Sequence, residues 1–246
     1  MSTFLEKDVY NEPRGFRWPT EEWQRLKRSA GDLSDHDFLQ AFEPVLSAFR
    51  ARTPHLESCA RALAQYYPPP LNVLELASGC DVFPAIMRSM GYQAVGLEAD
   101  SPASRYCNIH GIAVISPKNW NVPIWTEDRF DLIVLICFFT GVTENAYGRR
   151  MLARLCDNVI YQMQNGSQFL LFDKRCFEPL MSRFAKLKLT QNIRWTRHAL
   201  DGITFYSLAW RSHPWWGVLI TRTRLRMIRE YHQLKEVALR VKSRLP

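Results

Sequence analysis

The sequence lacks the features that would place a chain in a membrane, outside the cell or around a zinc ion. Its longest uninterrupted apolar run, from Leu132 to Phe139, is far shorter than the roughly 20 residues of a membrane span. The first residues, MSTFLEKDVYNE, contain acids and no apolar stretch of a secretory signal. The six cysteines are widely scattered, with no C-x-x-C pair. We therefore expect a cytoplasmic protein in a reducing setting, without a metal site or a disulfide framework.

Composition argues against disorder and draws attention to one end of the chain. Of the 246 residues, 47% are hydrophobic and 13% aromatic, which is enough for a packed core. This length suits one α/β domain with an appended helical segment. The formal net charge is +8, and residues 211–246 supply +7 of it from nine basic and two acidic side chains. Such an end suits phosphate-bearing partners or an anionic surface, or is simply a solvated helix face.

The first 67 residues have the pattern of a helical N-terminal cap. Ser34 with Asp37 three residues later resembles a capping box, which predicts the start of a helix. Three successive prolines at 68–70 forbid both a helix and a central strand, so a boundary is expected there. The helices expected in the cap span residues 20–30, 34–49 and 53–67.

After residue 70, short apolar runs alternate with helical stretches. Runs that are apolar throughout are typical of strands buried on both faces, as in a parallel sheet covered by helices. The alternation predicts the doubly wound, mostly parallel α/β class. Strands are expected at residues 71–76, 94–97, 112–115, 130–139 and 169–172, and helices at 84–90, 102–110 and 147–163.

The C-terminal part has a different pattern. Residues 203–210 and 215–225 are strand-like and are separated by a loop short enough for an antiparallel hairpin. A basic amphipathic helix is expected over residues 226–246, and its apolar stripe suits packing on the sheet, a homodimer or a partner subunit. We therefore divide the chain into a helical cap (1–67), an α/β domain (68–225) and this C-terminal helix.

The turn after the first strand carries the clearest chemical signal. Residues 73–81 read VLELASGCD, and Glu98 ends the next strand 19 residues after Gly79. A glycine lets a ligand approach the backbone, and an acid at that strand end can accept hydrogen bonds from two ribose hydroxyls. A dinucleotide would need G-x-G-x-x-G, whereas this turn has one glycine and Asp81, which would repel a pyrophosphate. An adenosine with a cationic or zwitterionic tail is the better fit.

At these residues the sequence resembles the class I S-adenosylmethionine-dependent methyltransferases. Residues 75–81, ELASGCD, are similar to the family's first motif, [VL]-L-[DE]-[LV]-G-x-G-x-G. Ala77 replaces its first glycine and Asp81 its third. Residues 95–98, VGLE, match the second motif, whose acid binds the cofactor ribose.

The resemblance extends to later strands and covers about residues 68–225. Residues 129–134, RFDLIV, look like the family's fourth strand, and 165–171, NGSQFLL, look like the entry to its fifth. The family's sheet ends with an antiparallel sixth and seventh strand. The resemblance therefore implies a Rossmann-like methyltransferase domain that uses S-adenosylmethionine.

Individual roles follow from the resemblance. It implies that Glu75 orders the turn and the methionine amino group, and that Glu98 holds the ribose. Ala77 is compatible with a negative φ and would crowd the ligand at a positive φ. After the third strand, Asn119 could contact adenine by an amide hydrogen bond, or Trp120 by stacking. The implied cofactor-binding set is Glu75, Ala77, Ser78, Gly79, Glu98, Ala99, Asn119 and Trp120.

No catalytic residue is assigned, because the sulfonium is already activated and positioning of the acceptor supplies most of the effect. A general base is optional. Residues 137–141 lack the Asn-Pro-Pro-Tyr type of motif used on exocyclic base amines, and Cys80 and Cys137 are expected to be buried structural thiols. The candidate bases are His36, His198, His213 and Asp173.

Two classes of function remain open from the sequence. The first is an enzyme that methylates a small molecule, favoured by the helical cap, or RNA, favoured by the basic C-terminal end. The second is a non-catalytic methyltransferase-like scaffold or partner subunit, favoured by Ala77 and Asp81. The retained Glu75, Gly79 and Glu98 favour the enzyme.

Overall fold

The computed structural model describes the N-terminal helices and the sheet of the chain. The described residues are 20–29, 31–98, 101–116, 130–136, 159, 163, 167–172, 181–182, 185 and 193–210. The predicted C-terminal helix, residues 226–246, and the strand-like run 215–225 lie outside them.

Within residues 20–67 of the described part, three helices precede the sheet, as the sequence predicts: α1 (Thr20–Ser29), α2 (Asp35–Ala51) and α3 (Thr53–Tyr66). The Ser34 side chain accepts a hydrogen bond from the Asp37 backbone N–H, so the expected cap of α2 is present. At α3, Arg52 occupies the N-cap position, its side chain makes no capping hydrogen bond to the helix, and Thr53 is already helical.

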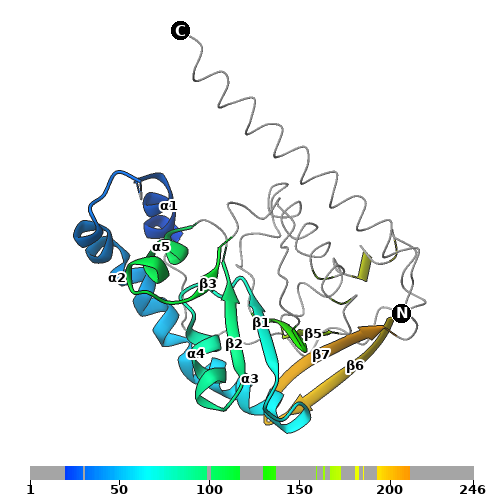
Figure 1. The fold of residues 1–246 in the computed structure, drawn as a ribbon. Coiled ribbons are helices and arrows are strands. Elements are labelled where there is room, and N and C mark those ends of the chain that lie inside the picture. Colours follow the sequence, from blue (N-terminus) through cyan, green and yellow to red (C-terminus); the bar gives the residue numbers. More distant parts are fainter. Residues whose placement is uncertain are drawn as a thin grey trace.

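The described residues contribute seven strands to one sheet, in the order β3-β2-β1-β4-β5-β7-β6. The pairs from β3 to β5 are parallel, whereas β7 runs antiparallel to both β5 and β6. This arrangement, shown in Figure 1, confirms the predicted doubly wound, mostly parallel sheet with a terminal antiparallel hairpin. The strands are β1 (Asn72–Leu76), β2 (Gln93–Leu97), β3 (Val114–Ile115), β4 (Leu132–Leu135), β5 (Gln168–Leu171), β6 (Ile193–Leu200) and β7 (Ile203–Trp210).

The hairpin is made from a different pair of segments than the sequence predicts. We expected residues 203–210 to pair with 215–225, but β7 is already bonded to β5 on one side and to β6 on the other. The two-residue turn between β6 and β7 is Asp201-Gly202, with φ values of 50° and 78°. Asp-Gly at positive φ is the favoured chemistry of a two-residue hairpin turn. Strand β6 was missed because it is largely polar and exposed.

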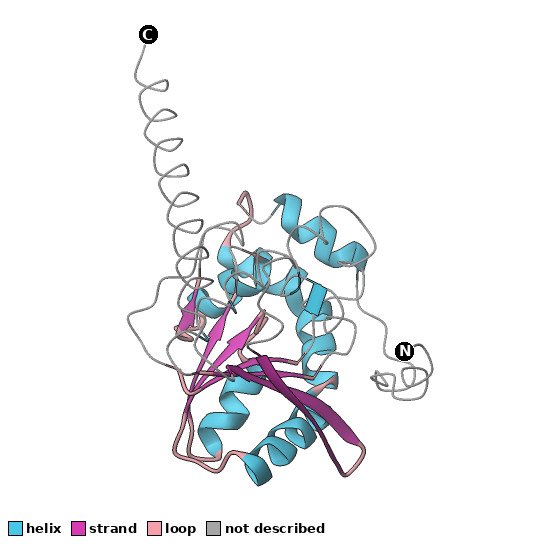
Figure 2. Ribbon diagram, turned by 90° about the vertical axis from the view of Figure 1, so that its right-hand side faces the viewer, coloured by secondary structure: helices cyan, strands magenta, loops and turns pink. Residues whose placement is uncertain are grey.

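Of the helices described in full, α4 (Val82–Ser89) connects β1 to β2 and α5 (Pro102–Ile109) connects β2 to β3. Helices α3 and α4 lie side by side and pack on one face of the sheet, and Figure 2 shows the helices alongside the strands. The opposite face has its own apolar cluster, to which the helical residues Val159 and Met163 contribute. Both faces of the parallel strands are therefore buried, as their apolar sequences require.

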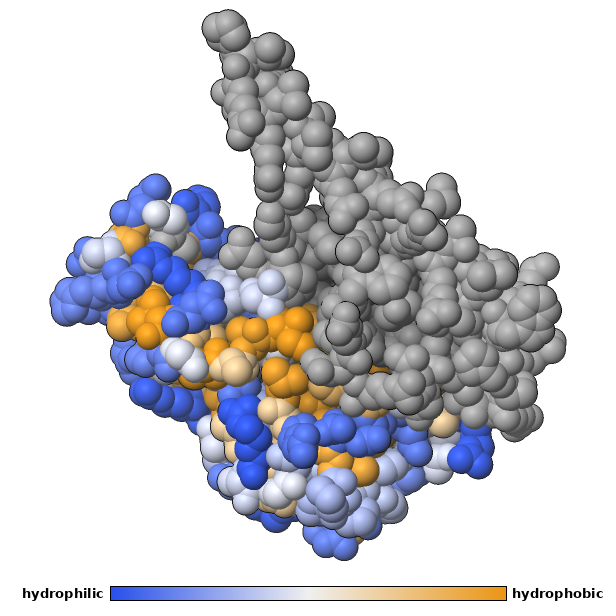
Figure 3. Space-filling view, viewed as in Figure 1, coloured by the Kyte–Doolittle hydropathy of each residue, from blue (hydrophilic) through white to orange (hydrophobic). Residues whose placement is uncertain are grey.

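A third apolar cluster joins the N-terminal helices to the carboxyl-end side of the sheet. Side chains of α1 and α2 pack with Cys80, from the turn after β1, and with Ala103 of α5. Figure 1 shows α1 and α2 gathered beside α5, and much of their visible surface in Figure 3 is hydrophilic. The cap helices thus reach the turn that the sequence singles out. Among the described helices, none is long and apolar enough to cross a membrane.

Candidate cofactor site at the turn after β1

The turn that links β1 to α4 has an unusual backbone. Ala77, Gly79 and Asp81 have φ values of 57°, 61° and 63°, in the left-handed region. Glycine adopts this region at little cost, whereas another L-residue pays about 1–2 kcal/mol. Ala77 therefore has the positive φ at which we expected its methyl group to crowd a ligand. Strain of this kind is typical of functional turns.

Glu98 ties the end of β2 to this turn. Its Oε2 accepts a hydrogen bond of 2.9 Å from the Gly79 N–H, and its Oε1 accepts one of 3.2 Å from the Ser101 hydroxyl. The side chain is buried, with 4% exposed. Burial raises the pKa of Glu98 to about 7, although the two hydrogen bonds favour the charged form. The acid predicted to hold a ribose is thus buried beside the turn, with a pKa close to neutral pH.

Glu75, on β1, is the second buried acid of the site. Its Oε2 has no hydrogen-bond partner among the described residues, and neither has the Oγ of Ser78. Burial, followed by the neighbouring Asp81 charge, raises the pKa of Glu75 well above its ordinary value, and Arg52 partly opposes this. A buried polar atom without a partner costs about 1–3 kcal/mol. Such atoms are candidates to bind a polar ligand.

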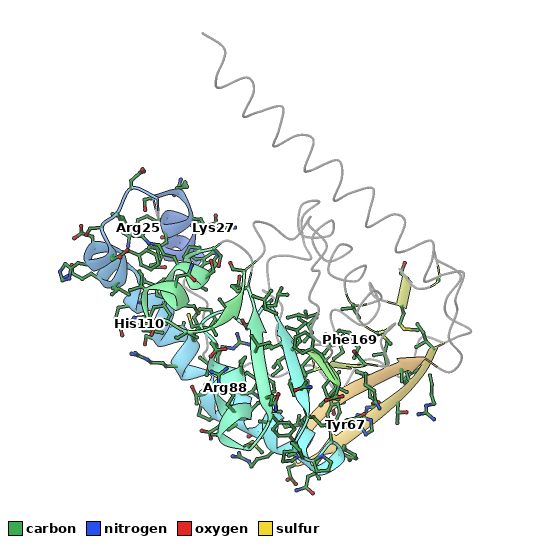
Figure 4. The ribbon with its side chains drawn as sticks, in the orientation of Figure 1. Arg25, Lys27, Tyr67, Arg88, His110 and Phe169 are labelled. Atoms are coloured by element: carbon green, nitrogen blue, oxygen red, sulfur yellow. The ribbon has the colours of Figure 1, made fainter. Side chains whose placement is uncertain are left out.

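Asp81 forms an ion pair that the sequence did not reveal. Its Oδ2 accepts a hydrogen bond from Arg88 of α4, a residue labelled in Figure 4. The Arg88 guanidinium also donates to the Ala94 carbonyl of β2 at 2.9 Å. The Asp81 side chain is only 3% exposed. Burial raises its pKa, and the bond and charge of Arg88 lower it. The charge we expected beside the ligand is therefore partly offset within the protein.

The space beside Gly79 is filled by an aromatic ring from the cap. A Cβ atom added to Gly79 would lie 2.3 and 2.6 Å from two ring carbons of Phe49, near the end of α2. Real Cβ atoms essentially never come closer than 3.0 Å to a heavy atom outside their own and the neighbouring residues. Glycine is required here because of the ring as well as the positive φ. This contact between cap and turn joins distant parts of the sequence and has no local sequence signal.

The donor set fits a nucleoside ligand with a cationic tail. Two buried carboxylic acids lie at the carboxyl ends of adjacent parallel strands: Glu75 is on β1, and Glu98 directly follows β2. One oxygen of Glu75 has no hydrogen-bond partner among the described residues. Where parallel strands end, open α/β sheets bind their ligands. The fit requires one change, because the Phe49 ring lies against the glycine that a ligand would approach.

The predicted site residues fall into two groups: those that the structure brings together and those outside its described part. Glu75, Ala77, Ser78, Gly79 and Glu98 are brought together around the turn. Ala99, Asn119 and Trp120 lie outside the described residues, as do the candidate bases His213 and Asp173. Sequence reasoning missed Arg88 and Ser101, and only Ser101, a helix-capping serine before Pro102, had a local signal.

The two described candidate bases lie elsewhere. His36 is exposed on α2 and shares a hydrogen bond with Gln40. His198 is on β6, at the sheet edge, where it bonds Ser207 and contacts the rings of Tyr66 and Phe205. Strand β6 is separated from β1 by three other strands, so His198 has an ordinary structural environment.

The thiol of Cys80 also has a structural environment. Cys80 is buried among cap side chains, and burial raises its pKa above the ordinary value. The neighbouring Cys107 thiol lies 3.7 Å from the Gly79 carbonyl, to which it donates. A thiol held protonated is a poor nucleophile, which agrees with the expected structural role of Cys80. Cys137 lies outside the described residues.

Comparison with known proteins reveals similarity in fold only. No family model matches the chain, and no curated protein matches its sequence. A TehB-like SAM-dependent methyltransferase from Corynebacterium glutamicum ATCC 13032 is 14% identical, with a TM-score of 0.46, over 69% of this chain and 97% of that one. DesVI from Streptomyces venezuelae is 8% identical, with a TM-score of 0.48, over 72% and 99%. SAM-bound CalS10, an amino pentose methyltransferase from Micromonospora echinaspora, is 11% identical, with a TM-score of 0.42, over 66% and 94%.

The class is defined by the sheet itself. Five parallel strands in the order 3-2-1-4-5, followed by an antiparallel hairpin that inserts β7 between β5 and β6, form the class I SAM-dependent methyltransferase fold. The resemblance inferred from residues 75–81 and 95–98 is thereby confirmed at the level of fold. Fold alone does not assign an activity, so the function must be argued from the site.

Proposed function

We propose that this protein binds S-adenosylmethionine at the turn after β1 and transfers its methyl group to a small-molecule acceptor. The observation that carries the proposal is the pair of buried acids, Glu75 and Glu98, at the ends of adjacent strands around a left-handed turn. Glu98 is supported as the ribose ligand by its place at the end of β2. Glu75 is supported as the partner of the methionine ammonium by its spare, buried oxygen.

The cofactor, when bound, would supply a methyl group already activated by the sulfonium. The chain's own task is then to hold the two reactants in line and to exclude water. The cap helices α1 and α2 support this, because their apolar side chains pack onto Cys80 of the turn. Such a cover over the cofactor turn favours a small acceptor over a large one.

Calorimetric titration with S-adenosylmethionine and S-adenosylhomocysteine tests the proposal. We expect micromolar binding that Glu98→Ala abolishes and that Glu75→Gln weakens about tenfold or more, because each removes a charged partner. Glu43→Gln is the matched control, since Glu43 is an exposed acid of the cap that pairs with Arg50. A folded wild-type protein that binds neither ligand would refute the proposed methyltransferase function.

The second candidate is a non-catalytic scaffold with the same fold. It is favoured by the strained Ala77 and by the Phe49 ring against Gly79, because both occupy space at the turn. Absence of ligand binding, combined with a partner that co-purifies and depends on the cap, would support it.

RNA is the rival acceptor, favoured by the basic residues after position 210, which lie outside the described part of the chain. A salt-dependent mobility shift of RNA, with affinity falling steeply between low and high salt, would favour RNA over a small molecule.

A further inference from the structure

The contact between Phe49 and Gly79 closes the candidate site from the cap side. The ring occupies the position that a Cβ atom on Gly79 would take. Phe49 itself is buried, with 7% exposed. The N–H of Gly79 is donated to Glu98, which is also buried. A ligand that uses Glu98 and passes close to Gly79 therefore competes with the ring for the same space.

Arg105 anchors the cap at the N-terminal end of α2, far from Phe49 at the other end of the helix. The guanidinium of Arg105, on α5, donates hydrogen bonds of 2.8 Å to the Leu33 carbonyl and of 2.8 Å to Asp35. It also lies 4.4 Å from the ring centre of Phe38. These contacts hold the first turn of α2 against α5.

Between this anchored end and Phe49, the helix contains a proline. Pro44 has no N–H, so it cannot donate the helical bond to the carbonyl four residues earlier, and kinks in helices concentrate at such positions. Just past Phe49, α2 ends at Ala51 and α3 begins at Thr53. The segment that carries Phe49 thus lies between a missing helical hydrogen bond at Pro44 and the break between α2 and α3.

We propose that Phe49 is a gate on the cofactor site. In the closed state described here, its ring covers Gly79, and ligand entry requires the ring, with the second half of α2, to move off the turn. The first half of α2 stays on α5 through Arg105. Cofactor binding is thereby coupled to the conformation of the cap. This inference rests on the function proposed above.

A ring deletion tests the gate through binding affinity. We expect Phe49→Ala to bind S-adenosylhomocysteine about tenfold more tightly than wild type, because the ligand no longer has to displace a buried ring. The matched control is Phe42→Ala, which removes the same ring from the same helix and apolar cluster. Phe42 stacks on Phe38 and Tyr106, and no atom of it is among the nearest neighbours of Gly79. Phe42→Ala is expected to bind no more tightly than wild type.

Hydrogen exchange on the unmodified protein gives an independent measurement that does not depend on a tolerated mutation. Saturating S-adenosylhomocysteine should accelerate amide exchange in residues 45–52 and leave residues 35–42 unchanged. Protection of residues 45–52, or no change there, would overturn the gate.

The failure of the gate and the failure of the proposed function give different results. If wild type binds and Phe49→Ala binds equally or more weakly, while Phe42→Ala remains folded and binds as wild type, the gate is wrong and the function stands. If folded wild type and both variants bind neither S-adenosylmethionine nor S-adenosylhomocysteine, both proposals are wrong.

Discussion

Ala77 stores strain that a single substitution should release. Its φ of 57° suits glycine, which also stands at this position in the family motif. We predict that Ala77→Gly raises the free energy of unfolding by up to about 1 kcal/mol, because the left-handed penalty exceeds the extra unfolded-state entropy of glycine. Urea denaturation measures the change. Ala85→Gly, at an exposed position inside α4, is the control and should lower stability by about 1 kcal/mol.

The Glu98 carboxyl makes stability depend on pH. Its folded-state pKa of about 7 lies above the ordinary 4.5, so the native state binds the proton more tightly than the unfolded chain does. The resulting stabilisation is complete below pH 4.5 and is lost as the pH rises through 7. Relative to Glu98→Gln, wild type should therefore lose about 3 kcal/mol between pH 4.5 and 8.

Denaturant titrations of wild type and Glu98→Gln at several pH values measure this difference. The amide of glutamine can still accept from Gly79 and can donate to Ser101, so the fold should tolerate it. Glu43→Gln, an exposed cap variant, should differ from wild type by less than about 0.5 kcal/mol at every pH. Parallel pH profiles for wild type and Glu98→Gln would contradict the buried titration.

At the scale of elements, the sequence predicts the helices and the parallel strands well because their signals are local. Capping at Ser34 and the prolines at 68–70 mark helix boundaries, and continuous apolar runs mark strands buried on both faces. Strand β6 escapes this reasoning because it is a polar edge strand whose Trp195 is half exposed. The Asp201-Gly202 pair is a strong sequence signal for a two-residue hairpin turn. It should have counted for more than the apolar run at 215–225.

The β6–β7 turn gives an element-scale prediction. Gly202 has a φ of 78°, so Gly202→Ala should destabilise the protein by about 1–2 kcal/mol through backbone strain, since an added Cβ meets no atom within 4 Å. Gly31→Ala is the matched control: its Cβ also meets nothing, and Gly31 is not among the positive-φ glycines. The control should be neutral or slightly stabilising. Thermal unfolding of the two variants checks the difference, and equal effects would contradict the turn assignment.

At the scale of the whole molecule, the site is assembled from segments that the sequence identifies singly but does not place together. Glu75, Gly79 and Glu98 are recognisable because the strand-turn-helix-strand order carries them. The Phe49 ring over Gly79 and the Arg88 partner of Asp81 depend on how α2 and α4 pack. A helical pattern marks Phe49 as apolar and Arg88 as exposed, and says nothing about which turn they meet.

The raised pKa values of both acids predict proton-linked binding by the whole site. A ribose diol binds the charged form of Glu98, of which only about a tenth is present at pH 6 when the pKa is about 7. Affinity for S-adenosylhomocysteine should therefore rise about tenfold from pH 6 to pH 8, with proton release on binding at pH 6. Glu75, whose pKa is also raised, acts in the same direction when it meets an ammonium. Calorimetry in buffers of different ionisation enthalpy counts the protons, and Glu98→Gln should release fewer. Binding of equal strength at both pH values would show that the ligand does not engage Glu98.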